Sequence, residues 1–283
     1  MKTTFVHITD LHISAPELAD SKLRSDTTTT VRNVIEMIKQ IEPRPSFVIA
    51  SGDLTNHGDA ASFRTLAGMM EGFDIPVVWA LGNHDTREGF HAGLLGSTGS
   101  ADQPYDHQQV IDGIHVITLD TSNPLRIGGH LVEAQFAFLE AALDEHAELP
   151  KIIVMHHAPA LDQDPVWEWK SLSFSATDRL AAILKGREIA GIFSGHIHQD
   201  RFTQWHGIPL IVGMGLHAAL DPLHPMVDSI RSVQGSSFSL CVLRDSGLTV
   251  TCAPLPSDRH ELGISTIEQL QAYEAARAAQ FAA

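Results

Sequence analysis

Residues 4–12 read Thr4-Phe5-Val6-His7-Ile8-Thr9-Asp10-Leu11-His12 and join an apolar run to an aspartate and a histidine. The first five of these residues have the length and composition of a buried β-strand. Four later runs also end in polar clusters. They are Phe47–Ala50 before Gly52-Asp53, Val77–Leu81 before Gly82-Asn83-His84-Asp85, Ile152–Met155 before His156-His157, and Ala190–Phe193 before Gly195-His196-Ile197-His198. The order of these clusters predicts repeated strands, each with functional side chains at its carboxyl end.

The polar clusters are expected to converge in space. In an α/β sheet the carboxyl ends of the strands line one crevice, so residues far apart in the sequence meet there. The clusters contain carboxylates, an amide and imidazoles but no thiolate. That ligand set suits Mn²⁺, Fe²⁺ or Fe³⁺, Zn²⁺ and Co²⁺, and it does not suggest a closed structural zinc site. The pattern therefore predicts a metal centre with two ions.

Helical patterns alternate with the strands, as expected for an α/β protein. Apolar residues recur at helical spacing in 26–42, 133–145 and 177–187. After His198 the pattern changes to short strand-like runs. These runs are 207–214, 238–244 and 248–254.

The five clusters resemble the motifs of the calcineurin-like metallophosphoesterase superfamily, which are D-x-H, GD, GNH(D/E), H and G-H-x-H in this order. The matching region covers roughly residues 3 to 215. Any single motif is weak evidence, but five in order, each behind a strand, are specific. The resemblance implies an α/β fold, a four-layer α/β/β/α sandwich of two mixed sheets flanked by helices, with the strands after His198 completing the second sheet.

The resemblance also implies a role for each cluster. One metal is expected on Asp10, His12 and His198, and the other on Asn83, His156 and His196. Asp53 is expected to bridge both ions, because a shared anion offsets the repulsion of two cations about 3.5 Å apart. A metal-bridging hydroxide is then the expected nucleophile.

Three further histidines are candidates outside the ligand set. His84 is the expected catalytic residue, which stabilises or protonates the leaving oxygen. His217 corresponds loosely to a histidine near the substrate in the small-diesterase members of the family. Neighbouring strand residues face opposite ways, so His157 is expected behind the ligand His156.

Among the subfamilies, the chain resembles the bacterial class III cyclic nucleotide phosphodiesterases and the related glycerophosphodiesterases. It lacks the D-R-G triplet of the Ser/Thr protein phosphatases and continues its GD motif as Leu54-Thr55-Asn56-His57-Gly58. We therefore expect a phosphoric diester hydrolase acting on a small phosphodiester, with a 3′,5′-cyclic nucleotide favoured. The alternatives are a glycerophosphodiester phosphodiesterase, a phosphomonoesterase and an inactive metal-binding relative. A monoesterase would need a cationic clamp, for which Arg87 is the candidate.

Composition limits the possible partners. The 283 residues include 34 Asp and Glu against 19 Lys and Arg, a formal charge of −15. This excess argues against nucleic acid as a partner, because a protein surface that binds nucleic acid is basic. The first residues enter a core strand with no apolar stretch long enough for a signal peptide or a membrane span. A small-molecule substrate, no membrane partner and a cytoplasmic location are expected.

The domain organisation is expected to comprise a metallophosphoesterase domain over 1–260 and a C-terminal helix over 261–283. That helix would pack on the domain or contact a second copy in a homo-oligomer. A hairpin with a Ser246-Gly247 turn would place Cys241 opposite Cys252. In a reducing cytoplasm two thiols are favoured over a disulfide, which this proximity would still allow.

Overall fold

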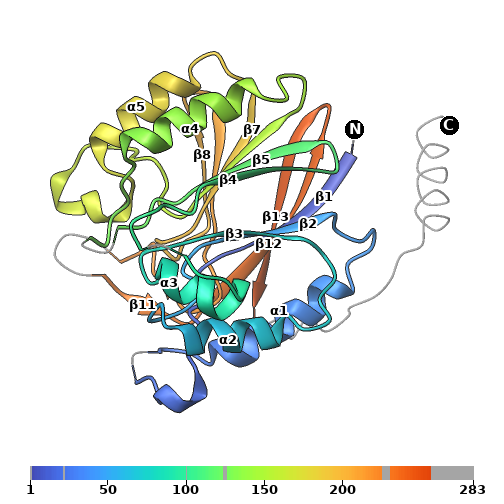
Figure 1. Cartoon of the computed structure of the whole chain (residues 1–283), viewed down its shortest axis with the longest axis vertical. Helices are drawn as coiled ribbons and strands as arrows, with labels where there is room; N and C mark the ends of the chain where they lie inside the picture. The colour runs from blue at the N-terminus through green and yellow to red at the C-terminus, as the bar shows by residue number, and fades with distance from the viewer. Residues whose placement is uncertain (1, 22, 100, 124–125, 225–229, 256–283) are drawn as a thin grey trace, which may run out of the picture.

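Two β-sheets pack face to face and carry helices on their outer faces (Figure 1). The architecture comes from a computed structural model that describes residues 2–21, 23–99, 101–123, 126–224 and 230–255, without the side chains of 165–167. Within these ranges, no helix combines the length and the apolar character needed to cross a membrane.

The first sheet has five strands in the order β13-β12-β1-β2-β3. Its parallel part consists of β1 (Lys2–Ile8), β2 (Phe47–Ser51) and β3 (Val77–Ala80), and β12 (Ser236–Arg244) and β13 (Gly247–Leu255) extend it antiparallel. Six of the seven residues of β1 are buried, because both faces of this strand are covered. That explains why its apolar residues, Phe5, Val6 and Ile8, do not simply alternate with exposed polar ones.

The second sheet has six strands in the order β4-β5-β6-β7-β9-β8. They are β4 (His107–Ile111), β5 (Ile114–Leu119), β6 (Lys151–Met155), β7 (Ile189–Ser194), β8 (Arg201–Trp205) and β9 (Ile208–Val212). The four central strands are parallel, and the two edge strands run antiparallel to their neighbours.

Four helices cover the outer faces. α1 (Thr27–Lys39) and α2 (Ala60–Met69) pack on the first sheet, and α4 (Glu133–Asp144) and α5 (Phe174–Leu184) pack on the second. The shorter elements are η1 (Pro16–Leu18), α3 (Arg87–Phe90), the π-helical turn η2 (His91–Leu95), η3 (Pro165–Lys170), β10 (Ala219–Leu220) and β11 (Ser232–Val233). The four-layer α/β/β/α sandwich is thereby confirmed.

Aromatic side chains fill the space between the two sheets. Phe5 and Phe47 stack with ring centroids 4.8 Å apart, and Phe193 of the opposite sheet meets Phe5 edge-on at 5.4 Å. All three are fully buried. Contacts of this kind fix the distance and register between the sheets, and therefore between the side chains at their ends.

The strands after His198 differ from the expectation. β12 and β13 join the first sheet beside β1, whereas β8 and β9 join the second. These strands are therefore divided between the two sheets and do not all belong to the second one. The helix expected over 177–187 occupies Phe174–Leu184. Local periodicity predicts the type of an element but carries no information about which distant strand it pairs with.

The predicted cysteine register is wrong. Arg244 pairs with Gly247, so the turn lies at Asp245-Ser246, one residue earlier than expected. Cys241 therefore faces Val250, and Cys252 faces Ser239. Both cysteines are free thiols, as favoured from the sequence. The helix expected over 261–283 lies outside the described residues.

Replacing Phe47 by Ala is expected to lower the free energy of unfolding by about 3–5 kcal/mol, because a buried aromatic ring is lost from the core between the sheets. The matched control is Phe202→Ala, at a side chain 52% exposed on the edge strand β8, with a change of about 0.5 kcal/mol or less. Urea unfolding of metal-free protein measures both. Equal losses would contradict the assignment of Phe47 to the central core.

Candidate metal centre

The polar clusters meet where strands of both sheets end. Asp10 and His12 follow β1 of the first sheet, and Asp53 follows β2. His156 follows β6 of the second sheet, and His196 and His198 follow β7. The structure therefore brings the expected ligands together at one end of the sandwich.

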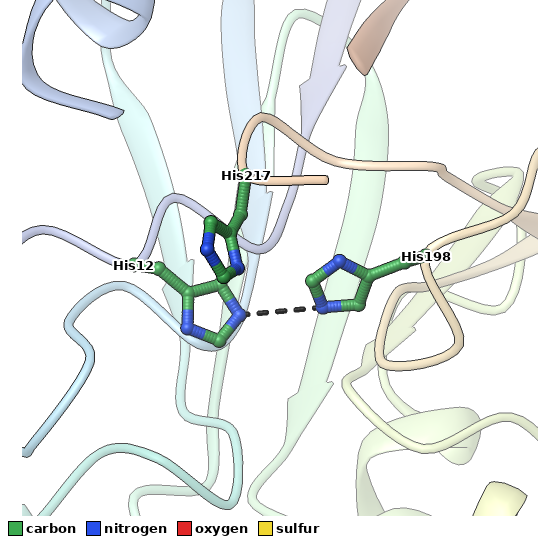
Figure 2. A group of neighbouring side chains, drawn as sticks. All are labelled: His12, His198 and His217. Carbon is green, nitrogen blue, oxygen red and sulfur yellow. Dashed lines mark hydrogen bonds between the residues drawn. The ribbon is translucent and has the colours of Figure 1, made fainter. Parts of the chain in front are cut away.

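The first group of candidate ligands surrounds the Nε2 atom of His198. This atom lies 3.2 Å from Asp10 Oδ1 and 3.3 Å from His12 Nε2 (Figure 2). His12 Nε2 in turn lies 3.9 Å from Asp10 Oδ1 and 3.7 Å from Asp53 Oδ2. Asp10, His12 and His198 are thus close enough together to bind one ion.

The second group adjoins the same Asp53 oxygen. His156 Nε2 lies 3.2 Å from Asp53 Oδ2, but it makes no hydrogen bond within the described part of the chain. The buried Oδ1 of Asn83 also lacks a hydrogen-bond partner among the described residues. His196 completes the group, with its ring 5.2 Å from that of His156. Asp53 therefore lies between the two groups, where a bridging carboxylate would be needed.

Backbone carbonyls orient the imidazole rings. Nδ1 of His156 donates to Ser51 O at 2.8 Å, and Nδ1 of His198 donates to Ala218 O at 2.6 Å. His196 uses its other nitrogen and donates from Nε2 to Trp169 O at 2.7 Å. Each bond places a proton on one nitrogen and leaves the other available for a metal.

These residues fit a pair of metal ions. Nδ1 of His12 and Nδ1 of His198 each donate to an acceptor, so Nε2 of each neutral ring carries a lone pair. Two lone pairs repel, and the two Nε2 atoms can lie 3.3 Å apart only with a proton or a cation between them. The buried Oδ1 of Asn83, which has no hydrogen-bond partner among the described residues, also calls for a donor or a cation, because burying a polar atom without a partner is unfavourable. We propose that Asp10, His12 and His198 hold one ion, that Asn83, His156 and His196 hold the other, and that Asp53 bridges them.

The pKa shifts show where protons lie without metal. Burial opposes the charged forms of Asp53 and His156, but their mutual attraction lowers the pKa of Asp53 well below its usual range and raises that of His156 to about 9. In the same way, despite the effect of burial, Asp10 raises the pKa of His198. Burial lowers the pKa of His12 to about 3. Bound metal would replace the protons that these carboxylate–imidazole pairs share.

The backbone turns sharply at the candidate ligands. Asp10, His12, Asp53, His196 and His198 all have positive φ, between 45° and 76°. This left-handed conformation is uncommon outside glycine, although Asp and His adopt it more readily than β-branched residues do. Strain of this kind concentrates at functional sites, where the surrounding structure must compensate it.

The glycines of the motifs allow close approach of these turns. A Cβ atom on Gly82 would clash with the carboxylate of Asp53, and one on Gly195 would clash with Asp10 and with the hydroxyl of Thr9. The glycine before Asn83 and the glycine before His196 are thus required by packing against the carboxylates of Asp53 and Asp10.

His84 and His217 both lie close to His12. Each ring centroid is 4.7 Å from that of His12, and His217 is 5.8 Å from His198 (Figure 2). His84 is exposed, and its Nδ1 donates to Asn56 O at 2.9 Å. Nε2 of His217 accepts from the backbone of Arg24 at 3.0 Å. Both histidines are therefore placed to contact a molecule bound beside His12.

His157 lies behind the second group. Its Nε2 donates to Ile127 O at 2.9 Å, and its Nδ1 accepts from the hydroxyl of Thr121 at 2.8 Å. Neither nitrogen is left for a metal. Its ring packs 4.4 Å from that of His196, as expected for a supporting residue.

Sequence reasoning assigned no role to two residues of the site. Asp85 accepts hydrogen bonds from the backbones of Leu54, Thr55 and Gly82, which tie the loop of Asp53 to that of Asn83. Asn56 contacts His12 with its side chain and His84 with its backbone. The only signal in the sequence was their place within the GD and GNHD motifs.

Arg87 and the loop after His156 also have defined places. Arg87 Nε donates to the buried Asp120 at 2.7 Å, and its other nitrogens bond to the carbonyls of Ala101 and Ser122. It is a structural residue, which argues against its use as a phosphate clamp.

Trp169, in the loop after His156, reaches the site through the carbonyl that accepts from His196.

Protein purified without chelator is expected to contain close to two transition-metal ions per chain at saturation. Asp53→Ala is expected to cause the largest loss of metal of any single ligand change, because it removes a ligand from both ions. Asp74→Ala, which removes a surface carboxylate that is 74% exposed, is the control. Elemental analysis measures the content, and saturation at one ion would contradict the two-ion centre.

Comparisons with known proteins identify the family of the chain. The family model of the calcineurin-like phosphoesterases matches residues 3–200. A relative from Rhodococcus erythropolis, named "probable cyclic nucleotide phosphodiesterase", is 34% identical over 75% of this chain and 70% of its own. A "probable glycerophosphodiester phosphodiesterase GpdQ" from Arcobacter nitrofigilis is 25% identical over 82% of this chain and 83% of its own.

Solved structures share the fold. The purple acid phosphatase PPD1 from yellow lupin superposes with a TM-score of 0.64 at 12% sequence identity, over 92% of this chain and 53% of that one. At this identity the likeness concerns the fold alone. The family match, which covers most of the chain, confirms the resemblance drawn from the five motifs. The chain belongs to the calcineurin-like phosphoesterase family.

Proposed function

We propose that this chain is a metal-dependent hydrolase of phosphoric diesters and that its preferred substrates are 3′,5′-cyclic nucleotides. The observation that carries the proposal is the place of the Asp53 carboxylate between two groups of ligand atoms. Divalent ions held there would lower the pKa of water toward neutrality and offset the charge of a phosphate. The family of the chain and the names of its relatives support this type of reaction.

His84 is the proposed catalytic residue. Because its Nδ1–H donates to the carbonyl of Asn56, Nε2 can donate a hydrogen bond only when the ring is protonated. In that form the exposed ring can stabilise a phosphoryl oxygen or give its proton to the departing alkoxide. The hydrogen bond to the carbonyl keeps the ring oriented while its outer edge meets the substrate.

His217 is proposed to orient the substrate. Its Nε2 is occupied by the backbone N–H of Arg24, so the neutral ring carries its proton on Nδ1. That proton is available to an ester oxygen next to His12 and His198. The two histidines thus offer two hydrogen-bond donors to one phosphoryl group beside His12.

The charge of the substrate favours a diester. A diester carries one negative charge and a monoester nearly two, and the second charge calls for an added cation such as an arginine clamp. Arg87, the candidate clamp, is held by Asp120 instead. This supports a diesterase over a phosphomonoesterase.

Two observations favour a nucleotide over a glycerol ester. The relative named for cyclic nucleotides is more similar to this chain than the relative named for glycerophosphodiesters, at 34% against 25% identity. The half-buried Trp169 lies with its ring 6.1 Å from that of His196 and offers an aromatic surface beside the site. A nucleobase can stack on such a surface, whereas glycerol cannot.

His84→Ala is expected to lower kcat by about 100-fold or more and to leave the metal content largely intact, since it removes a donor to the reacting group and no proposed ligand. Asn83→Ala, one residue earlier, is expected to weaken metal binding. His91→Ala, at a histidine bonded to Ser97, is the control and should change neither. Steady-state kinetics with elemental analysis separates the variants. Loss of metal in His84→Ala as complete as in Asn83→Ala would refute the role of His84.

Substrate preference is tested on Mn²⁺-loaded protein with cyclic AMP, cyclic GMP, a glycerophosphodiester, bis(p-nitrophenyl) phosphate and p-nitrophenyl phosphate. The expected order of kcat/KM places the aryl diester above the monoester and the cyclic nucleotides above the glycerophosphodiester. Equal or better turnover of the monoester would indicate a phosphomonoesterase. Inactivity on all five with two metals bound would indicate a metal-binding relative without turnover.

A cytoplasmic location and a homo-oligomeric state stay predictions.

A further inference from the structure

The side chain of Asn56 is buried between two loops of the site. It is 6% exposed, and its backbone N–H donates to Ile13 O at 3.0 Å. The neighbouring Thr55 forms a β-bridge with Ile13. Asn56 is therefore held rigidly beside the turn that carries His12.

A carboxylate determines which way the Asn56 amide points. Nδ2 of Asn56 lies 2.6 Å from Asp20 Oδ2, and the side chain of Asp20 is only 3% exposed. An ionised carboxylate accepts hydrogen bonds and cannot donate, so the NH₂ group must face Asp20. The amide oxygen must then face the other way. Ser14 Oγ and His57 Nε2 contact the same Asp20 oxygen, each at 2.7 Å, and hold it in place.

The amide oxygen reaches His12. Asn56 Oδ1 lies 2.9 Å from His12 Nδ1 in a buried hydrogen bond. Because this oxygen can only accept, His12 must carry its proton on Nδ1, and its Nε2 is left with a lone pair toward Asp53 and His198. Asp20 thus determines the tautomer of a proposed metal ligand through one intervening amide.

The backbone of the same residue holds His84. Asn56 O accepts from His84 Nδ1 at 2.9 Å, and the rings of His12 and His84 lie 4.7 Å apart. One residue therefore contacts a proposed metal ligand with its side chain and the proposed catalytic residue with its carbonyl. Substitution of the side chain separates the two contacts, since every residue at this position keeps the carbonyl.

We propose that Asn56 is a positioning residue which, oriented by Asp20, sets the tautomer and ring direction of His12 and so raises the metal affinity of the centre. The inference rests on the proposed metal centre and not on which ester is hydrolysed. It assigns roles to two side chains, those of Asn56 and Asp20, that lie outside the ligand set.

The test compares four variants by the binding of Mn²⁺ to chelator-treated protein, measured by calorimetry. Asn56→Ala is expected to weaken one of the two binding steps by roughly 10- to 100-fold, the usual effect of losing the hydrogen-bond partner of a metal-bound histidine. At saturating metal its loss of kcat should be smaller than that of His84→Ala, because the carbonyl that holds His84 remains. Asn33→Ala, at an exposed asparagine of α1, is the control.

An exchange of the two side chains provides the sharper variants. Asn56→Asp places two carboxylates at the 2.6 Å contact with Asp20 and is expected to bind metal poorly, because like charges repel. The double variant D20N/N56D restores a donor facing an acceptor, and the new carboxylate at position 56 can still accept from His12. It should recover most of the lost affinity. Thermal unfolding of the metal-free proteins shows whether each variant is folded.

Unchanged affinity in Asn56→Ala would overturn the proposal. So would a double variant that binds metal no better than Asn56→Asp alone while both are folded, because a purely steric role for Asn56 would not respond to the exchange. Failure of the proposed function is distinct. In that case the protein would not hydrolyse cyclic nucleotides, but the metal affinities of all four variants would still follow the expected order.

Discussion

The approach of two imidazole nitrogens, His12 Nε2 and His198 Nε2 at 3.3 Å, is the contact on which the centre depends. His12 follows a strand of the first sheet and His198 a strand of the second. Asp53 and His156 are divided between the sheets in the same way. A shift of one residue between the sheets, about 3.3 Å along a strand, would separate every such pair. The aromatic core around Phe5 therefore supports the chemistry at the end of the sandwich.

The backbone is locally strained at the turns that carry the proposed ligands. Residues in the left-handed region cost on the order of 1–3 kcal/mol each when the conformation is unfavourable. Hydrogen bonds between the loops compensate this strain: His12 N donates to Asp53 O at 3.0 Å, and His196 N donates to the carboxylate of Asp10. The loops thus hold one another, and each ligand turn is stabilised by a turn from another strand.

A second set of contacts decides what each ligand can do. Ser51, Trp169 and Ala218 contribute backbone carbonyls that accept from His156, His196 and His198. His12 receives a side-chain amide in their place, and this amide needs Asp20 to orient it. A carbonyl is available whatever residue carries it, whereas the contact to His12 depends on the identity of residue 56. The centre should therefore be more sensitive to substitution of residue 56 than to substitution of residues 51, 169 or 218.

The sequence by itself determined the core strands and the polar residues that end them, because an apolar run and the polar cluster after it are local features of the chain. Only the tertiary structure decided that β12 and β13 join the first sheet, that Cys241 faces Val250, and that Arg87 pairs with Asp120. It also decided that Asn56 lies between His12 and His84. Strand pairing and side-chain partners join residues far apart in the chain, and the packing of the two sheets selects among many partners that the local pattern allows equally.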